Sequence, residues 1–422
     1  MPSRKNNRGD SMKRRIVIVG GGAAGLAAAA SLLKRKRDLD IAVIEPKEEH
    51  WYQPGWTMVG GGVFDYGVTV RPQSMVTPNG VTWICRAVKA FEPETNAVVL
   101  DDGVRIEYDF LIAAPGVKLN FAAVKGLEET LGKNGVTSNY QPGLAPLTWR
   151  LVQEMKRGKA IFTQPPPPFK CAGAPQKAMY LSCSEWRRAG VLKDIEVSFC
   201  TAAPALFGVA DYVPALMDYV KSYGVKLNLG STLVAVDGAA KMATFREKDA
   251  SGADVEIVRD FDFLHVTPPQ VAADAVRDSP LADAAGWIDV DQATLRHKKY
   301  ANVFALGDAC NAPNAKTAAA ARKQAPIVAE NLLAAMAGAP APFVYDGYGS
   351  CPLTVERGKI VLAEFGYGGK LLPTFPKWLN DGVRPSGLAW MLKAKILPWV
   401  YWNLMFRGHE WFAAPSNRNP AA

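Results

Sequence analysis

The feature that most constrains this chain is a β-branched run that meets three spaced glycines, RIVIVGGGAAGLAAAASLL at residues 15–33. Gly20, Gly22 and Gly25 occupy the glycine positions of a G-x-G-x-x-G pattern. In that pattern the first glycine permits a tight turn, the second lets the backbone approach a pyrophosphate, and the third lets the helix pack on the strand. The stretch predicts a strand, a turn and a helix whose N-terminus binds phosphate, because free N–H groups and the helix dipole favour negative charge there.

The next apolar run completes the unit. DIAVIE at residues 40–45 is typical of a second strand, and Glu45 lies 20 residues beyond Gly25. An acidic residue at that distance accepts hydrogen bonds from a ribose. An ordinary Gly/Ala-rich turn would need neither the second strand nor the acid, so we predict a dinucleotide site.

Composition sets the class of protein and of partner. With 422 residues, of which 49% are hydrophobic, the chain is long enough for two or three domains with cores. The net charge of +9 suits an acidic partner, but the basic residues are scattered and no RNA- or DNA-reading motif is present. We therefore expect a membrane surface and no nucleic acid. No apolar run reaches the roughly 18–20 residues that span a bilayer, and the polar residues 1–12 are expected to be a disordered tail.

A second strand-and-turn signal lies far downstream, in NVFALGDACNAP at residues 302–313. Flavoproteins with two dinucleotide folds use this pattern to hold the flavin's ribityl chain, so Asp308 and the glycine loop together predict FAD. Lys316 and Thr317 then open an Ala-rich helix to about Met336, whose N-terminus would point at the flavin. We expect a discontinuous FAD domain with halves at residues 12–115 and 295–344. Its first half should contain one strand over residues 81–90, a hairpin over 97–108 and a buried strand over 110–115.

The region between the halves, residues 116–294, is expected to form a second Rossmann-like domain, with strands at 159–163, 196–200 and 225–229. The turn after its first strand is QPPPPFKCAGAP at residues 164–175. Four successive prolines offer no N–H group to a pyrophosphate and cannot begin a helix there. The sequence therefore predicts that NAD(P)H is not a substrate, and it places Cys171 where the nucleotide phosphates would lie.

Residues 345–422 are expected to form a C-terminal module that begins near Cys351 and contains LAWMLKAKILPWVYWNLMF at residues 388–406. Two lysines and Pro398 interrupt this apolar stretch, which suits insertion into a membrane interface rather than a span. The alternative is a pair of helices packed in the core. The predicted fold class is thus α/β, with two Rossmann-like domains and a membrane-associating module.

The six cysteines, at positions 85, 171, 183, 200, 310 and 351, show no C-x-x-C and no zinc spacing, so we expect no metal site and no disulfide scaffold. Cysteines beside a flavin suggest dithiol–disulfide chemistry, but Cys171 and Cys351 can meet only through the fold. We expect Cys85, Cys183, Cys200 and Cys310 to be small core residues.

Several stretches resemble the sulfide:quinone oxidoreductases, and within them the mitochondrial-type branch, from about residue 13 to residue 408. The most specific are IEPKEEHWYQPGW, FKCAGAPQKAMYLS, LHVTPPQ, YDGYGSCPL and LPWVYWNLMFRG. The resemblance implies that Cys171 and Cys351 are the redox cysteines. It implies FAD contacts on the glycine loop, including Ala23 and Ala24, and on Glu45, Gln53, Val88, Asp308 and Lys316. The segment TVERG at residues 354–358 departs from the family's usual pattern, which leaves substrate access there open.

The resemblance also implies a mechanism. Hydrogen sulfide attacks a Cys171–Cys351 disulfide at Cys351, leaving a persulfide there, and the Cys171 thiolate adds to flavin C4a. The pair re-forms as the sulfane sulfur passes to glutathione, sulfite or sulfide, and two electrons reduce FAD. Ubiquinone then takes these electrons away. Lys170 and Lys316 are candidates for lowering the thiol pKa. The protein is then expected to be a peripheral protein of a respiratory membrane, either the bacterial or the mitochondrial inner membrane.

Two other functions are weighed against this one. A type II NADH:quinone oxidoreductase shares the fold, FAD and the membrane habit, but the proline-rich turn at residues 165–168 argues against it. A binding or signalling flavoprotein that contacts nucleic acid would not need paired cysteines or an apolar C-terminal segment. His265 could relay protons near the flavin, although a structural histidine is the expected role.

Overall fold

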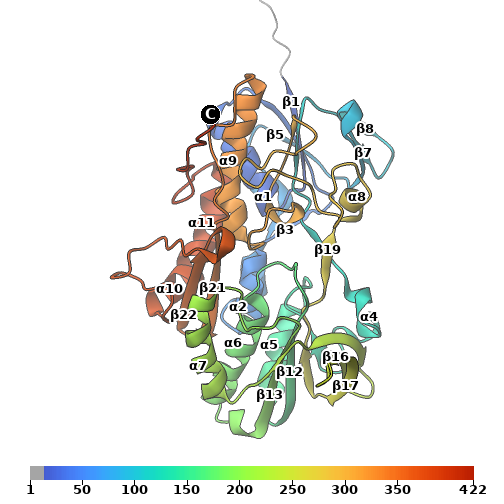
Figure 1. Cartoon of the computed structure of the whole chain (residues 1–422), viewed down its shortest axis with the longest axis vertical. Helices are drawn as coiled ribbons and strands as arrows, with labels where there is room; N and C mark the ends of the chain where they lie inside the picture. The colour runs from blue at the N-terminus through green and yellow to red at the C-terminus, as the bar shows by residue number, and fades with distance from the viewer. Residues whose placement is uncertain (1–13) are drawn as a thin grey trace, which may run out of the picture.

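Two parallel five-stranded sheets lie toward opposite ends of the long axis of the computed structural model (Figure 1). The structure describes residues 14–422, and the tail expected over residues 1–12 lies outside the described residues. The two sheets are joined by an antiparallel pair, β10 (Val117–Leu119) and β19 (Gln270–Ala272). This arrangement agrees with the predicted α/β class and its two Rossmann-like domains.

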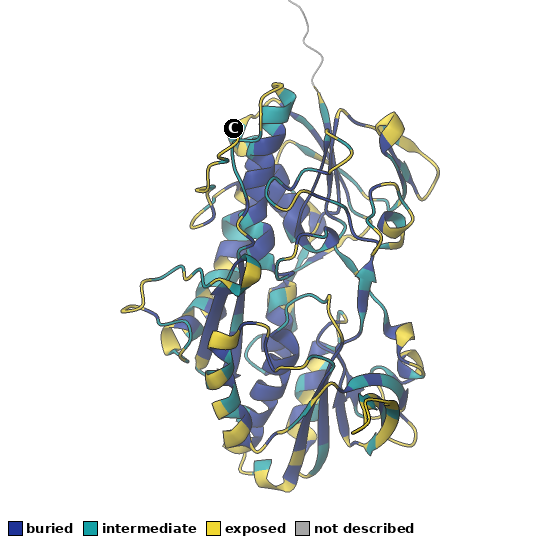
Figure 2. Ribbon diagram, in the orientation of Figure 1, coloured by how far each residue is buried: buried dark blue, intermediate teal, exposed yellow. Residues whose placement is uncertain are grey.

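The first sheet has the order β20-β9-β1-β2-β5. Its strands are β1 (Arg15–Val19), β2 (Asp40–Ile44), β5 (Val81–Ile84), β9 (Phe110–Ala113) and β20 (Val303–Ala305). The edge strand β20 pairs with β9 although it follows in the chain only after the whole second sheet. Helices α1 (Ala23–Arg35) and α9 (Ala318–Met336) pack together beside this sheet, so its apolar strands are buried (Figure 2).

The prediction of one continuous strand over residues 81–90 is wrong. The structure divides it into β5, which pairs with β2 in the parallel sheet, and β6 (Val88–Glu92). β6 turns away to pair with β7 (Ala97–Leu100), and β7 pairs with β8 (Arg105–Glu107). The bend between β5 and β6 lies at the surface and carries Cys85, which is exposed. The expectation that Cys85 is a core residue is therefore also wrong.

The second sheet has the order β11-β18-β12-β13-β14. Its strands are β11 (Val136–Thr137), β12 (Gly158–Gln164), β13 (Ile195–Thr201), β14 (Lys226–Leu229) and β18 (Phe263–His265). The helices of this region are α5 (Ala145–Glu154), α6 (Ala174–Arg188) and α7 (Val213–Tyr223). An antiparallel sheet of β15 (Thr232–Asp237), β16 (Met242–Lys248) and β17 (Asp254–Asp260) lies beside it (Figure 1).

The last part of the chain forms a hairpin and a broken helix. Strands β21 (Gly349–Glu356) and β22 (Lys359–Phe365) are antiparallel, and β21 packs against α6. Helix α10 (Gly387–Met391), a π-helical turn (Leu392–Ile396) and α11 (Leu397–Asn403) follow one another without a gap. Within residues 14–422, no helix has both the length and the apolar character needed to cross a membrane.

Candidate active site

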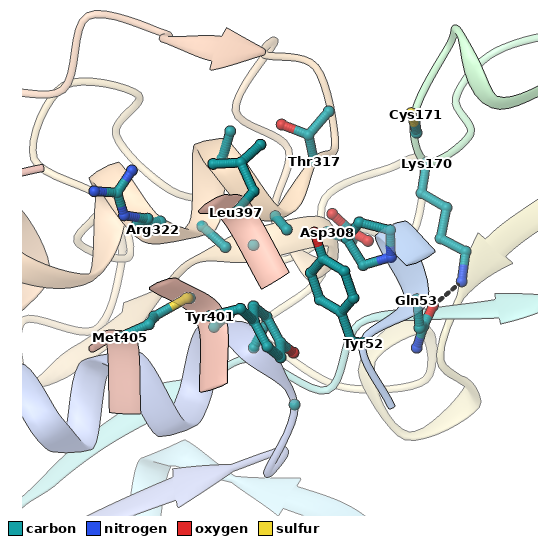
Figure 3. Close-up of a pocket in the computed structure, with 18 of the residues that line it drawn as sticks. Tyr52, Gln53, Lys170, Cys171, Asp308, Thr317, Arg322, Leu397, Tyr401 and Met405 are labelled. Carbon is teal, nitrogen blue, oxygen red and sulfur yellow. Dashed lines mark hydrogen bonds between the residues drawn. The ribbon is translucent and has the colours of Figure 1, made fainter. Parts of the chain in front are cut away.

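One cavity of about 410 Å³ lies where both domains and the C-terminal segment meet. Its lining comes from the glycine loop, the aromatic loop after β2, the loop after β12, the start of α9, the β21–β22 hairpin, the π-helical turn and helix α11. Figure 3 shows side chains from these distant segments converging on it. Residues separated by more than 300 positions therefore share one site.

The glycine loop is shaped by two different constraints. Gly20 has a φ of +100°, and a Cβ there would lie 2.3 Å from the carbonyl oxygen of Ala114. A Cβ at Gly25 would lie 1.9 Å from the Gly20 oxygen, so Gly25 serves the packing of α1 on the loop. Gly22, by contrast, has no atom within 4 Å of the Cβ position and lines the cavity. Its open space is available to a ligand.

The start of α1 has free hydrogen-bond donors. Gly22 is its N-cap, no side chain caps the helix, and no acidic residue lies in the first turn. Ala23 and Ala24 line the cavity beside it. Such a helix end binds the phosphates of a dinucleotide.

Glu45 follows β2 and lines the same end of the cavity. Its carboxylate accepts hydrogen bonds from the backbone N–H groups of Gly21, at 2.9 Å, and Lys47, at 3.1 Å. These contacts fix the carboxylate next to the glycine loop. That is the place from which the sequence predicted a ribose contact.

Asp308 follows β20 and also lines the cavity. Burial raises the pKa of its carboxyl group, while the charges of Lys316 and Lys170 oppose that rise. No residue among 14–422 donates a hydrogen bond to the carboxylate. The ammonium of Lys316 instead donates to the backbone carbonyls of Asp308 and Cys310, both at 2.8 Å, and so holds the Asp308 turn in place.

The open space at Gly22, the free start of α1 and the unsatisfied carboxylate of Asp308 fit the pyrophosphate and the ribityl hydroxyls of FAD. The first turn of α9 adds a second helix N-terminus, which Thr317 caps through a bond from Ala320 N–H at 3.1 Å. Gln53 lines the cavity and accepts a hydrogen bond from Lys170 (Figure 3). Val88 lies in β6, outside the cavity lining, and its role in binding FAD stays a prediction.

The fold brings the two predicted redox cysteines together. Cys171 lies in the loop after β12 and Cys351 in β21, and their sulfur atoms are 3.5 Å apart. Cys171 has a φ of +55° and lines the cavity, whereas Cys351 is 1% exposed. A Cβ at Gly173 would lie 2.5 Å from the Cys351 sulfur. A glycine at that position therefore lets the two cysteines approach each other.

A buried lysine that the sequence analysis missed stands beside the pair. Lys177, in α6, has its ammonium nitrogen 3.1 Å from the Cys171 sulfur and is 3% exposed. A hydrogen bond from the Cys351 thiol and the charge of Lys177 hold the Cys171 pKa well below its usual range, against the effect of burial. The candidates Lys170 and Lys316 instead donate to Gln53 and to backbone carbonyls. A single charged residue in the otherwise uncharged first turns of a helix was the available signal.

A second missed lysine comes from the C-terminal segment. Lys393 lies in the π-helical turn and donates to the carbonyl oxygen of Pro54 at 2.8 Å. Burial lowers its pKa to about 7. Its charge acts on Cys171 as well, so the C-terminal segment contributes to the electrostatics of the thiol site.

The remaining histidine and cysteine candidates have structural environments. His265 is fully buried, and its Nε2 accepts a hydrogen bond from the Asn139 N–H at 3.1 Å. Its Nδ1 is buried without a partner among the described residues, and burial lowers its pKa to about 3. Cys183, Cys200 and Cys310 are buried, and burial raises the pKa of Cys200 to about 11. Thiols with such raised pKa values are unreactive.

Comparisons with known proteins give the family of this chain. Residues 14–157 match the family model of the pyridine nucleotide-disulphide oxidoreductases. The mitochondrial sulfide:quinone oxidoreductase of Mus musculus is 40% identical over 370 residues, covering 88% of this chain and 81% of that protein. The one from Dictyostelium discoideum is 41% identical over 389 residues, covering 92% and 84%. This chain belongs to the sulfide:quinone oxidoreductase family.

Solved structures show how far this fold is shared. The sulfide:quinone oxidoreductase of Aquifex aeolicus aligns with a TM-score of 0.75 at 20% identity over 92% of both chains. The NDH2 of Plasmodium falciparum aligns with a TM-score of 0.66 at 11% identity, over 95% of this chain and 97% of that one. The fold alone therefore does not separate the family from its predicted rival. The curated relatives and the cysteine pair do.

Proposed function

We propose that this protein oxidises sulfide through Cys171, Cys351 and FAD, and passes two electrons to a membrane quinone. The observation that carries the proposal is the meeting of the two cysteine sulfurs, 3.5 Å apart, beside Lys177 in the cavity that fits FAD. The glycine loop, Glu45 and Asp308 would hold FAD, which would supply the two-electron redox chemistry between the thiol pair and the quinone.

The asymmetry between the cysteines sets the direction of attack. The pKa of Cys171 is lowered. The pKa of Cys351 is raised by the hydrogen bond between Cys351 and Cys171 and by the burial of Cys351. In a disulfide between them, Cys171 is the better leaving group, because thiolates of low pKa leave faster. Sulfide therefore attacks Cys351: the S–S bond breaks, a persulfide forms on Cys351, and Lys177 stabilises the departing Cys171 thiolate.

The persulfide sulfur then passes to a small nucleophile, which leaves a second thiolate on Cys351. The disulfide re-forms as the two thiolates lose two electrons, which FAD held in the cavity would accept. Glutathione, sulfite and sulfide all carry negative charge near neutral pH. The buried ammonium groups of Lys177 and Lys393 lie near the thiol pair, as their effect on the Cys171 pKa shows, and so favour an anionic acceptor. Turnover assays with each of the three acceptors would identify the one that the protein uses.

The C-terminal segment supports peripheral binding to a respiratory membrane, although one of its faces is core. Tyr401, Met405 and Phe406 are buried in the core of the first domain. Seven large apolar side chains after residue 377 are exposed: Trp378, Leu379, Leu388, Met391, Trp399, Trp411 and Phe412. Exposed tryptophans among apolar residues are typical of membrane interfaces. Ubiquinone would enter the cavity from this side.

An anaerobic titration of the bound flavin with sulfide tests the proposed function. Sulfide should bleach the flavin absorbance of the wild-type protein and of Cys85→Ser, whose thiol is exposed and distant from the pair. It should not bleach Cys171→Ser. Bleaching by NADH without bleaching by sulfide would identify a type II NADH:quinone oxidoreductase instead.

Sedimentation with anionic phospholipid vesicles tests the membrane proposal. Replacing Met391 and Trp399 by serine should weaken binding to the vesicles. Met242→Ser, which removes a side chain of similar exposure in β16, is the matched control and should bind as the wild type does. Equal binding of all three proteins would place the membrane contact elsewhere.

A further inference from the structure

The β21–β22 hairpin separates two chemical environments. Successive side chains of a strand point to opposite faces of a sheet. Cys351 pairs with Ala363, and both lie in the apolar cluster shared with α6. Their neighbours Ser350 and Glu364 also pair with each other, and both line the cavity on the other face. Strand β21, which contains Cys351, therefore also lines a second part of the cavity.

That second part holds a buried carboxylate with a network of hydroxyl groups. Glu364 is 5% exposed. Its Oε1 accepts hydrogen bonds from the hydroxyls of Tyr348 and Thr374, both at 2.5 Å, and its Oε2 accepts one from the Thr374 N–H at 3.0 Å. All three residues line the cavity. Among residues 14–422, no Lys, Arg or His forms an ion pair with Glu364. Lys323 interacts with Glu364 only through space. A buried carboxyl group held by hydroxyl groups rather than by an ion pair suggests a functional reason for it.

A half-buried cation faces the same space without pairing with that acid. Arg322 lies in the first turns of α9 and lines the cavity, and its Nε is buried without a hydrogen-bond partner among the described residues. Its charge acts on the hydroxyl of Tyr348. Unsatisfied buried donors need an explanation, and a ligand that accepts a hydrogen bond provides one. Figure 3 places Arg322 and Cys171 on opposite sides of the cavity.

The surroundings of this network suit a quinone. Phe375, Leu392 and Ile396 line the cavity near the hairpin and the C-terminal helices. The partly exposed Trp411 and Phe412 also belong to its lining, so the apolar wall reaches the surface proposed to meet the membrane. A quinone needs a polar contact for each carbonyl oxygen and an apolar path for its tail.

We propose that Glu364 and Tyr348 deliver a proton to the quinone as it is reduced, while Arg322 donates a hydrogen bond to a quinone carbonyl. This inference rests on the proposed function and deepens it. Reduction of a quinone to a quinol consumes two electrons and two protons. Two electrons and one proton arrive from the cofactor after sulfide oxidation, so the protein must supply one further proton.

The transfer balances along the network. The O–H bond of Tyr348 breaks as the second O–H bond of the quinol forms. Tyr348 regains a proton from the carboxyl group of Glu364, which is left as a carboxylate. Solvent reprotonates Glu364 before the next turnover. Thr374 orients the carboxyl group through its two hydrogen bonds and is a positioning residue.

Stopped-flow measurement of the two half-reactions tests this assignment. In Glu364→Gln, anaerobic reduction of the flavin by sulfide should keep its wild-type rate. Reoxidation by a short-chain ubiquinone should slow about 100-fold, a typical loss for a missing proton donor. Reoxidation by ferricyanide, which accepts electrons without protons, should stay at the wild-type rate. Tyr348→Phe should show the same pattern.

Glu356→Gln is the matched control, because Glu356 lies in the same hairpin and accepts a hydrogen bond from another tyrosine, Tyr219, at 3.2 Å. It should leave both half-reactions unchanged. Wild-type quinone reoxidation in Glu364→Gln would overturn the assignment, and so would an equal slowing with ferricyanide. If Glu364→Gln loses FAD, Tyr348→Phe decides by the same criteria. Failure of sulfide to reduce the wild-type flavin would overturn the proposed function instead.

Discussion

Two loops occupy equivalent places in the two parallel sheets and do different chemistry. The glycine loop joins β1 to α1, and residues 165–173 join β12 to α6. The first has open space at Gly22 beside a free helix N-terminus. The second begins with four prolines and ends with Cys171, two residues before the N-cap of α6. One topological position thus has an open helix N-terminus in one domain and carries a cysteine in the other.

The difference indicates that the strand–turn–helix unit favours negative charge in general and does not by itself select one particular ligand. The positive end of a helix favours any anion. Proline has no backbone N–H group, so the four prolines of the second loop cannot donate hydrogen bonds to a pyrophosphate. The start of α6 still favours the negative charge on Cys171. Lys177, in the first turns of the same helix, adds a full charge to that effect.

Cys171→Ser removes the thiolate from the second loop and should have the largest effect. Sulfide-dependent reduction of a short-chain ubiquinone should fall at least about 1,000-fold, as expected for the loss of an essential nucleophile. The FAD content should stay normal, because the glycine loop is unchanged. An active Cys171→Ser protein would show that the two loops do not divide phosphate and thiolate binding between them.

Lys177→Met tests whether the Cys171 thiolate in the second loop is stabilised by Lys177 as well as by the N-terminus of α6. The ammonium group favours the charged thiolate, so its removal raises the Cys171 pKa, and the thiolate then forms at higher pH. Flavin reduction by sulfide at neutral pH should slow about 100-fold, by analogy with the loss of one stabilising group. It should recover as the pH rises, and Lys177→Arg should restore much of it. A loss that does not depend on pH would indicate a packing role only.

Gly22→Ala probes the first loop. Because no protein atom lies within 4 Å of the added Cβ, the apoprotein should melt at the wild-type temperature. The methyl group fills the ligand space, so FAD should bind about 10-fold more weakly, which is about 1.4 kcal/mol. Gly20→Ala is the contrasting variant, since its Cβ clashes with Ala114 and should lower the melting temperature of the apoprotein. Equal FAD affinity in Gly22→Ala would place the pyrophosphate elsewhere.

The smallest effect is expected from adding NADH or NADPH. Neither should bleach the flavin measurably under anaerobic conditions, because the second loop lacks the N–H groups that bind nucleotide phosphates. A spectrophotometric trace over several minutes is sufficient. Rapid bleaching would show that the proline-rich loop does not exclude a nucleotide.

Local sequence patterns predicted the sheets and the FAD half-sites because those patterns depend on neighbouring residues. The glycine spacing and the run before Asp308 belong to this class. The break between β5 and β6 was missed, since β-branched residues stand on both sides of it and no glycine or proline marks it. The pairing of Cys171 with Cys351 came from the resemblance to a family, because nothing local connects them.

Buried charges were the least predictable part of the site. Lys393 lies in a stretch that suits a membrane interface, yet its ammonium group points inward to Pro54. Glu364 is an ordinary acid in a strand until the hairpin places it opposite Ser350 and beside Thr374. Tertiary packing decides which lysine or glutamate is buried. The spacing of residues along this chain does not predict that packing.

His50 gives the molecule a thermodynamic linkage between cofactor loading and the C-terminal segment. Its Nδ1 lies 3.1 Å from the Gly21 oxygen in the glycine loop, and its Nε2 lies 2.7 Å from the Tyr401 hydroxyl in α11. Burial lowers its pKa to about 4, so the ring is neutral at physiological pH and can bond at both ends. Because linkage is reciprocal, FAD that orders the loop also favours docking of α11, and a docked α11 favours FAD. The cofactor-free chain is therefore expected to hold its C-terminal helices less firmly than the loaded enzyme does.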